Sequence, residues 1–420
     1  MAFANSDGAE TVERSGSVPR AGAVMAILLL VFFLGTSDNQ MMSPLLPLIA
    51  GDFGYGGRVG EVGRFLGPAY ALAAAVAALL VGPISDKYGR RRFLLCASVL
   101  FGVSLLAVLL IKDFRALAIT RIFTGLAAGT FSTCSIAYVA DYFPYNRRGV
   151  AMSVVQAGYF GALVVGVPVA NQIAHWQGWR SSFAFFGLLS LLAFILIAAL
   201  LPEDKHLMRE QNLSARMARR FDNIRLVFER GDRVASIAAA FFVSGGFVGF
   251  FFYLGSWLRK DLKLDVGEVN LFFIAVGVAL LVGAVVAGPV ADRFGKRRLS
   301  ILSTVLLAPM LVLIPNLGWG LPLLACFLTA SLAFAFRQGP LQALATGLVP
   351  RRARGALVAV RNTASQIGIA VSTVASGPLY DNFGYVAVGA FGGVLTLAAI
   401  FCIILMKEPG AELAEGGEQV

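Results

Sequence analysis

Twelve apolar segments of about twenty residues each run through the chain. Charged residues make up only 14% of its 420 positions, against about 25% in a soluble globular protein. A backbone surrounded by lipid must satisfy its own hydrogen bonds, which long helices do. The sequence therefore predicts an all-α membrane protein with twelve transmembrane helices, and excludes an ordinary soluble enzyme. The segments lie at residues 22–49, 62–84, 93–111, 116–140, 150–171, 182–201, 234–257, 269–291, 299–315, 321–347, 356–378 and 384–406.

One polar connection divides these segments into two sets of six. Residues 202–233 carry eight basic and six acidic side chains and are too few to form a further domain. We expect a tail at 1–21, a six-helix bundle at 22–201, the linker at 202–233, a second six-helix bundle at 234–406 and a tail at 407–420.

The basic residues predict the orientation in the membrane. If the N-terminus is cytoplasmic, 24 basic residues fall in cytoplasmic segments, 8 fall outside, and Arg121, Arg337 and Arg361 lie within spans. Cytoplasmic loops carry the excess of Lys and Arg in membrane proteins. Both termini and the linker are therefore expected in the cytoplasm, in the inner membrane of a bacterium. The net charge of +11 reflects this topology, and no nucleic-acid partner is expected.

The two halves repeat a loop sequence at a fixed spacing. Gly82–Arg92 and Gly288–Arg298 share six identical residues at an offset of 206 positions. The same offset relates Arg148 to Arg354, each of which follows the fourth segment of its half. Internally repeated bundles are typical of transporters that work by alternating access, with the substrate held between the repeats near the middle of the membrane.

The repeated loops resemble those between helices two and three, and eight and nine, of the major facilitator superfamily. Arg121-Ile-Phe-Thr-Gly125 resembles the fourth-helix pattern of that family, and Asp141–Arg148 the loop that follows it. The glycines of the fifth segment, with Gly178-Trp-Arg180, look like those of proton-coupled drug and sugar exporters. The resemblance covers nearly the whole chain and implies two pseudo-symmetric six-helix bundles, most like the 12-helix drug:H+ antiporter branch.

The fifth segment departs from the strictest antiporter form, in which Gly and Pro are adjacent, because this chain has Gly166-Val-Pro168. Small residues allow helices to approach closely inside a membrane. The residues expected to serve helix packing are Gly125, Gly158, Gly161, Gly166 and Pro168.

The glycines and charges of the loops indicate a gate. Glycines permit tight turns, and a carboxylate can bind an arginine or helix N-terminal amides in one state and release them in the other. Basic loops that merely set topology would explain the arginines but not the placed Gly and Asp. The expected gating residues are Gly82, Asp86, Gly89, Arg90, Asp141, Arg148, Gly288, Asp292, Gly295, Lys296 and Arg354.

Asp38 and Arg121 are charges within spans, which are costly and therefore candidates for function. We interpret Asp38 as the proton-coupling carboxylate, with Arg121 or a substrate cation as its alternative partner. Protonation would neutralise Asp38 and favour one conformation. A permanent structural ion pair that joins the two helices is the alternative.

Arg337 and Arg361 have no intramembrane acid in their own half. The positive charge of these two arginines would suit an anionic or multiply hydroxylated substrate. Arg361 could instead extend to the membrane surface. Uncharged polar groups in hydrocarbon also need partners. The residues expected to bind substrate are Gln156, Tyr159, Tyr253, Arg337, Gln338, Arg361 and Asn362.

The sequence contains no GxxxxGK[ST] loop for nucleotide phosphates. Neither an enzyme nor a metal site is predicted, and no cofactor is expected beyond a proton gradient. The leading prediction is a proton-coupled secondary transporter that exports small amphipathic, sugar-like or acidic organic solutes. An uptake symporter for an organic anion is the alternative, and a receptor or an intramembrane enzyme is a remote one. The expected partners are a small-molecule substrate, protons and the lipid bilayer, and the chain is expected to act as a monomer.

Overall fold

The computed structural model describes residues 20–203, 224–350 and 353–406. These residues are almost entirely helical. The two predicted tails and the middle of the predicted linker lie outside the described residues, apart from the few that border the helices.

Six membrane spans form the first half. They are α1 (Ala21–Asp52), α2 (Val59–Tyr88), α3 (Arg90–Ala107) with the short turn η1 (Val108–Leu110), α4 (Phe114–Tyr142), α5 (Tyr145–Gly161) continued by η2 (Ala162–Gly166) and α6 (Val167–Gln177), and α7 (Trp179–Leu200). The widened π-helical turn η2 comes just before Pro168. A proline lacks the N–H of a helical turn and crowds the preceding carbonyl, so the helix widens there.

The second half contains the remaining spans. They are α9 (Gly231–Lys260), α10 (Val266–Phe294), α11 (Lys296–Leu313) with η3 (Ile314–Asn316), α12 (Leu321–Gly347) and α13 (Arg354–Ile404). The last of these, α13, holds two spans, because Gly384 breaks it with a φ of 75°. All twelve predicted segments lie in observed helices to within two residues, and the predicted fold class is confirmed.

The repeat seen in the sequence is also present in the backbone. Gly89 and Gly295 separate the second and third spans of their halves with φ of 93° and 86°, while Gly178 and Gly384 separate the fifth and sixth with 86° and 75°. Both pairs are 206 positions apart. Only glycine adopts such angles without strain, so each half uses a glycine to make the same two reversals.

A second matched contact closes each half. Arg91 donates a hydrogen bond to the carbonyl of Ala198 at 2.6 Å, near the end of α7. Its counterpart Arg297 donates to the carbonyl of Ile404, the last residue of α13. Carbonyls in the last turn of a helix have no partner within the helix, and a cation there also complements the helix dipole. Each repeated loop therefore caps the final helix of its own half.

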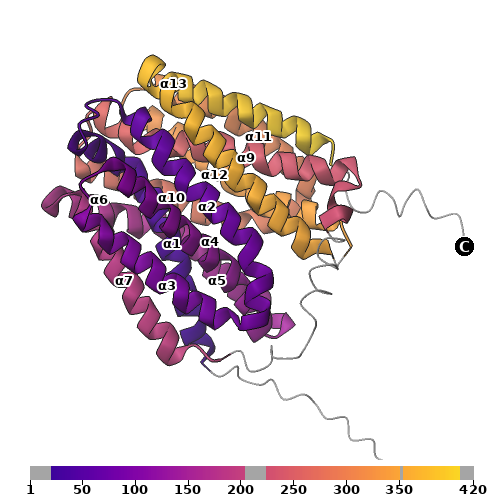
Figure 1. Cartoon of the computed structure of the whole chain (residues 1–420). Helices are drawn as coiled ribbons and strands as arrows, with labels where there is room; N and C mark the ends of the chain where they lie inside the picture. The colour runs from indigo at the N-terminus through magenta and orange to yellow at the C-terminus, as the bar shows by residue number, and fades with distance from the viewer. Residues whose placement is uncertain (1–19, 204–223, 351–352, 407–420) are drawn as a thin grey trace, which may run out of the picture.

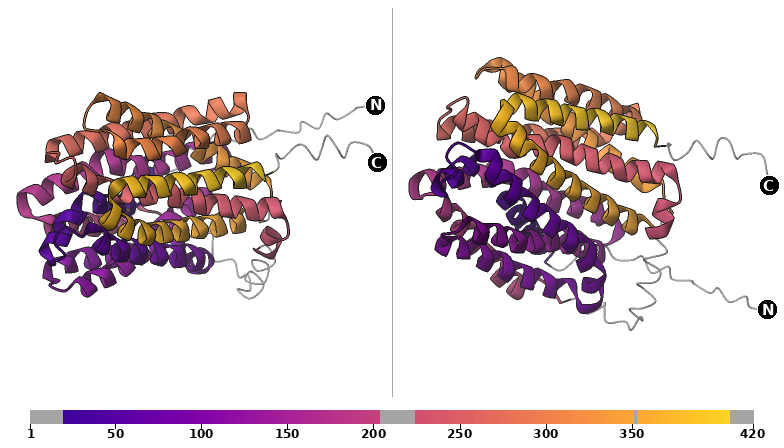
Figure 2. Two further views of the ribbon diagram at one scale, coloured as in Figure 1. Left: turned by 90° about the horizontal axis from the view of Figure 1, so that it is seen from above. Right: turned by 45° about the horizontal axis from the view of Figure 1, so that its top comes forward.

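The two halves lie side by side, with the first half in indigo to magenta and the second in orange to yellow (Figures 1 and 2). They meet where α2 packs against α13, α1 against α9, and η2 and α6 against α10. Twelve crossings return the end of α13 to the membrane face at which α1 begins. We call this the terminal face and the opposite one the distal face.

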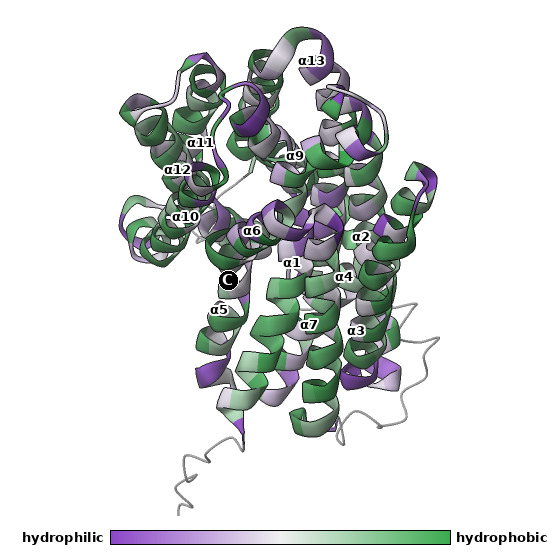
Figure 3. Ribbon diagram, turned by 90° about the vertical axis from the view of Figure 1, so that its left-hand side faces the viewer, coloured by the Kyte–Doolittle hydropathy of each residue, from purple (hydrophilic) through white to green (hydrophobic). Residues whose placement is uncertain are grey.

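Large apolar side chains cover the outward surface of the bundle. Leu192, Val285 and Leu397 are 47%, 71% and 55% exposed, and the outward faces of the long helices are mainly hydrophobic, with polar residues gathered at the helix ends (Figure 3). A continuous apolar surface of this kind would associate in water. The chain is an integral membrane protein.

Candidate functional site

A cavity of about 310 Å³ lies between the halves, bordered by α1, α2, α4, α5 and α13. Its walls are aromatic, small or polar without charge, and none of the described residues lining it is charged. The aromatic and polar lining residues are Phe32, Thr36, Asn39, Tyr70, Phe131, Ser132, Tyr159, Asn362, Ser365 and Gln366. Most come from the middle of their helices or the half nearer the terminal face, so we call this the main cavity.

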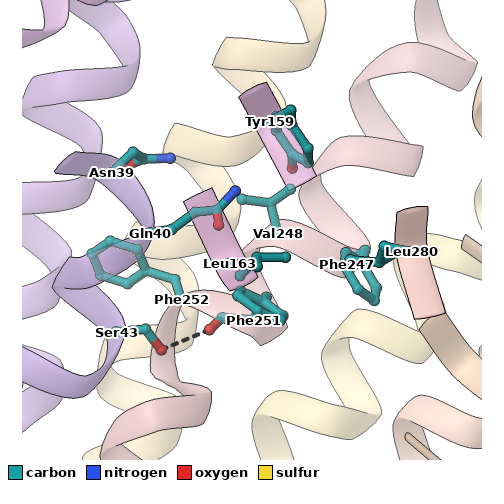
Figure 4. Close-up of a pocket in the computed structure, with 10 residues that line it drawn as sticks. All are labelled: Asn39, Gln40, Ser43, Tyr159, Leu163, Phe247, Val248, Phe251, Phe252 and Leu280. Atoms are coloured by element: carbon teal, nitrogen blue, oxygen red, sulfur yellow. Dashed lines mark hydrogen bonds between the residues drawn. The ribbon is translucent and has the colours of Figure 1, made fainter. Parts of the chain in front are cut away.

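A smaller chamber of about 30 Å³ adjoins the main cavity, because Asn39 and Tyr159 line both. Figure 4 shows its lining residues. They are Asn39, Gln40, Ser43, Tyr159, Leu163, Phe247, Val248, Phe251, Phe252 and Leu280. Because Ser43 lies further toward the distal face than Asn39 on α1, the chamber extends the site in that direction.

Asp38 and Arg121 form an ion pair directly behind the main cavity. One guanidinium nitrogen, Nη1 of Arg121, donates to both carboxylate oxygens of Asp38 at 2.7 and 2.8 Å. The two residues are 0% and 1% exposed. The Arg121 guanidinium also lies 4.8 Å from the centre of the Tyr70 ring, and Tyr70 lines the main cavity. One aromatic side chain therefore separates the charge pair from the cavity.

Two close helix contacts bring these charges together. A Cβ on Gly125 would overlap the backbone of Tyr70, and a Cβ on Gly35 would lie 3.1 Å from that of Ala128. The missing side chains allow α4 to approach both α2 and α1. The hydroxyl of Tyr70 then donates to the Gly35 carbonyl at 2.7 Å, which fixes the ring beneath the guanidinium.

The fifth-segment glycines also lie against α1. A Cβ on Gly158 would come within 2.9 Å of the Leu29 carbonyl, and one on Gly166 would overlap the side chain of Ser37. Gly161 is less restricted, because its Cβ would meet only Phe33 at 3.7 Å. Small residues at these positions hold the span near α1, so that Tyr159 reaches both cavities.

Of the residues expected to bind substrate, Tyr159 and Asn362 line the main cavity, and five line neither cavity. Gln156 and Gln338 are exposed on α5 and α12. Tyr253 is fully buried and donates its hydroxyl hydrogen to the Thr373 carbonyl at 3.0 Å. A hydropathy pattern does not show how a helix is rotated, so it could not separate the residues that line the cavities from these neighbours.

The two remaining arginines also lie outside the cavities. Arg361 is 5% exposed and donates to Oε1 of Gln342 at 3.1 Å, so its guanidinium stays inside the bundle rather than extending to the membrane surface. Arg337 is fully buried, packs over the ring of Phe334 and donates to the Val243 carbonyl at 3.4 Å. Neither has an acidic partner among the described residues.

Several lining residues were missed in the sequence. They are Phe32, Thr36, Asn39, Gln40, Tyr70, Ser132, Ser365 and Gln366. The sequence contains a feature that could have identified Gln366, and another that could have identified Asn39 and Gln40. Gln366 follows Asn362 by one helical turn and so shares its face, and Asn39 and Gln40 directly follow Asp38.

The loop charges pair within the first half in this conformation. Arg90, the first residue of α3, contacts Asp86 near the end of α2 at 2.7 Å and Asp141 at the end of α4 at 2.5 Å. Arg148 donates to the Phe143 carbonyl at 3.4 Å. Arg90 thus ties the α2–α3 turn to the end of α4.

The second half lacks this arrangement. Lys296 and Asp292 occupy the positions of Arg90 and Asp86 but are exposed and form no ion pair within the described part of the chain. Gly347 stands where Asp141 stands in the first half, so the third member is missing. Arg354 is exposed at the start of α13. Gly82 and Gly288, expected to permit tight turns, lie instead within α2 and α10, and the chain reverses at Gly89 and Gly295. Among the described residues, ion pairs hold only the first of these two reversals.

Replacing Arg90 by Gln should slow transport roughly fivefold, the effect of losing about 1 kcal/mol from a partly exposed ion-pair network. The matched control is Lys296→Gln, which removes the equivalent cation, one without an ion pair among the described residues, and should change the rate little. Initial rates of solute flux, normalised to the amount of protein in the membrane, provide the measurement. Equal rates in the two variants would contradict a gating role for Arg90.

Asp381 joins the halves at the distal face. Its two carboxylate oxygens accept hydrogen bonds from the backbone N–H groups of Gly60 and Glu61, both at 2.8 Å. These are free amides in the first turn of α2, where the helix dipole also favours a negative charge. A residue of the second half therefore caps a helix of the first.

Ser43 makes a second contact between the halves. Its hydroxyl donates to the Phe251 carbonyl at 2.9 Å and accepts from the Gly255 N–H at 2.8 Å. Its own carbonyl accepts from the Ser256 hydroxyl at 3.1 Å. With the Asp381 contact, these bonds join the halves on the distal side of the chamber.

Comparison with known proteins agrees with this architecture. The sequence profile of the Major Facilitator Superfamily matches residues 28–266 and 237–419. Two Bacillus subtilis proteins known only as the uncharacterized MFS-type transporters YceJ and YwfA are each 26% identical. The alignments cover 90% of this chain and 92% of YceJ, and 94% of this chain and of YwfA.

Solved structures share the fold at low sequence identity. A D-xylose–proton symporter superposes with a TM-score of 0.77 at 20% identity, over 93% of this chain and 98% of its own. A bacterial homologue of the human lysosomal transporter Spinster, in an inward-facing conformation, gives 0.73 at 15% identity, over 93% and 95%. The profile spans both repeated halves and the full-length relatives are transporters, not enzymes. The chain is a transporter that belongs to the Major Facilitator Superfamily.

Proposed function

We propose that the protein is a proton-coupled secondary transporter that exports small, uncharged amphipathic or sugar-like solutes by alternating access. The observation that carries this proposal is the buried Asp38–Arg121 pair, one side chain away from the main cavity. A carboxylate at this depth is costly unless it is paired. Protonation would remove the charge that holds α1 to α4, so binding of a proton and movement of the helices that line the cavity are linked.

The lining of the cavities supports an uncharged solute. The expectation of acidic solutes depended on Arg337 and Arg361, which lie outside both cavities. The alternative of an organic-anion symporter depended on the same arginines and on the departure of Gly166-Val-Pro168 from the strictest antiporter form. A carboxylate in the main cavity would be desolvated without a facing cation, which is unfavourable. Aromatic rings and carboxamides instead suit a ring or chain that carries hydroxyl groups.

The direction of transport is proposed from the fifth-segment glycines, which resemble those of exporters, and from the predicted orientation. With the terminal face in the cytoplasm, the contacts of Asp381 and Ser43 close the outer side. Solute then enters the main cavity from the cytoplasm. A fold shared with a proton symporter is compatible with both uptake and export. The direction of transport therefore needs its own test.

Membrane vesicles of the two orientations provide that test. A panel of neutral glycosides, polyols and aryl alcohols is offered to inverted and right-side-out vesicles with an imposed pH gradient. Export in exchange for protons predicts accumulation in inverted vesicles whose interior is acid. Accumulation only in right-side-out vesicles with an acid exterior would show proton-coupled uptake and overturn the proposed direction.

A protein of this kind is driven by the gradient and needs no cofactor. We propose the bacterial inner membrane as its location and the monomer as the working unit, since both cavities are formed within one chain.

A further inference from the structure

We infer that Gln40 forms the end of the solute site and selects a small uncharged group that both donates and accepts hydrogen bonds, a hydroxyl group in particular. This inference rests on the proposed function, because it takes the main cavity and the chamber as the place where solute binds.

The carboxamide oxygen of Gln40 is buried without a partner. The residue is 8% exposed, and its Oε1 atom has no hydrogen bond in the described protein. Buried polar groups are nearly always paired, and an exception needs an explanation. Ser43, one turn further along α1, shows the usual situation, since its hydroxyl is bonded to Phe251 and Gly255. Figure 4 shows Gln40 among the chamber residues, between Asn39 and Leu163.

The dimensions of the chamber limit what can bind Gln40. A volume of about 30 Å³ has room for roughly two water molecules, so it accepts a terminal group and not a ring. Leu163, Phe247 and Phe251 form apolar walls and are each at most 7% exposed. The terminal group must therefore be carried on an apolar stem.

The charge of the chamber excludes ionised groups. None of the described lining residues is charged, and the nearby carboxylate of Asp38 is already held by Arg121. A carboxylate or ammonium group would lose its hydration without gaining a counter-charge. A hydroxyl group can donate to the carboxamide oxygen and accept from its nitrogen, so it matches Gln40 whichever way the amide is turned.

The junction with the main cavity orients the rest of the solute. Asn39 and Tyr159 line both spaces and, like Asn362 and Gln366 of the main cavity, form no hydrogen bond with the described protein. By contrast, Ser132 in the same wall bonds to the Gly129 carbonyl of its own helix. The free amides and the phenol can bind polar groups on the solute body, which lies toward the terminal face while the hydroxyl group points to the distal face.

Four compounds with one phenylpropyl body test this assignment on the purified full-length protein. Binding of tritiated 3-phenylpropan-1-ol is measured at equilibrium, with 1-fluoro-3-phenylpropane, 3-phenylpropanoate and 3-phenylpropan-1-amine as competitors. The fluoride has nearly the size of the alcohol but cannot donate. We expect the fluoride to bind about tenfold more weakly than the alcohol, because it leaves the buried amide unsatisfied. The two ions should bind more weakly still.

Variants assign the effect to Gln40. Gln40→Leu should weaken alcohol binding about tenfold and reduce the ratio between alcohol and fluoride to about one, as expected when both partners of one hydrogen bond are removed. Gln177→Leu changes an exposed glutamine at the end of α6 and should leave the ratio unchanged. A wild-type ratio near one, a ratio that survives Gln40→Leu, tightest binding of an ion, or no binding of any of the four compounds would overturn the inference.

The Asp38→Asn variant separates this inference from the proposed function. It leaves the residues of the chamber intact, so the ratio between alcohol and fluoride should persist. If that ratio is present while a pH gradient drives no solute flux in the wild-type protein, proton coupling is refuted and the role of Gln40 stands. If flux is proton-driven and the ratio is absent, only the role of Gln40 fails.

Discussion

Asp38→Asn should abolish proton-driven transport while solute exchange without a gradient continues. Asparagine keeps the shape of aspartate and can still accept a hydrogen bond from Arg121, so the contact between α1 and α4 survives in part. It cannot gain or lose a proton at any pH used in transport assays. We therefore expect accumulation under a pH gradient to fall to the level of protein-free liposomes, and counterflow of labelled solute to stay within about threefold of wild type.

The same measurements distinguish coupling from a purely structural ion pair. If the pair only joined two helices, Asp38→Asn would lower expression or thermal stability, and both kinds of flux would decline together. Proton-driven accumulation at the wild-type level in the variant would exclude Asp38 as the coupling residue. Asp52→Asn is a suitable control, because Asp52 lies at the distal end of α1 in a partly exposed contact with Arg180.

Arg121→Gln should destabilise the protein more than any other single change to the site. It leaves Asp38 as a lone carboxylate at 0% exposure, and removing one partner of a buried ion pair costs about 3–5 kcal/mol. The double variant Asp38→Asn with Arg121→Gln removes both charges and should recover most of this loss, although it should not recover proton coupling. Unfolding midpoints of the purified proteins in the same detergent provide the comparison.

Arg361→Gln serves as the matched control for that experiment. Arg361 is also a buried arginine within a span, but its partner is the uncharged Gln342, so its removal strands no charge. Its loss of stability should be clearly smaller than that of Arg121→Gln. If the double variant is no more stable than Arg121→Gln alone, the stranded carboxylate is not the cause.

The sequence predicts the fold well because the membrane imposes a simple constraint. Each span must be long and apolar, and each turn must hold residues that water can solvate. These features are local, so Gly89 and Gly295 could be recognised as matching turns from the repeated sequence motif in which each lies. The break of α13 at Gly384 falls where the twelfth segment, 384–406, was predicted to begin, whereas the widened turn before Pro168 was not predicted.

A charge marks a site residue in the sequence because its burial is costly, whereas of the uncharged residues proposed to bind substrate only Tyr159 and Asn362 line the main cavity. Asp38 and Arg121 stand out in apolar spans, and the structure pairs them. Gln40 and Gln366 do not stand out in the same way, because uncharged side chains are tolerated on several faces of a helix. Both lipid and the opposite half of the protein are apolar neighbours, so composition does not reveal which face of a span borders the cavity. Arg337 shows the limit most clearly, since its guanidinium is buried against Phe334 and away from both cavities.

The contacts that join the halves at the distal face depend heavily on main-chain atoms. Asp381 is bound by the amides of Gly60 and Glu61, and Ser43 by the carbonyl of Phe251 and the amide of Gly255. Every residue type except proline supplies such an amide, and all supply the carbonyl. Substitutions at Glu61 and Phe251 therefore leave the closing bonds in place, whereas a Cβ on Gly60 or Gly255 would overlap the backbone of Gly377 or Pro44. Evolution can alter the cavity walls, and with them the choice of solute, without having to rebuild the closure each time.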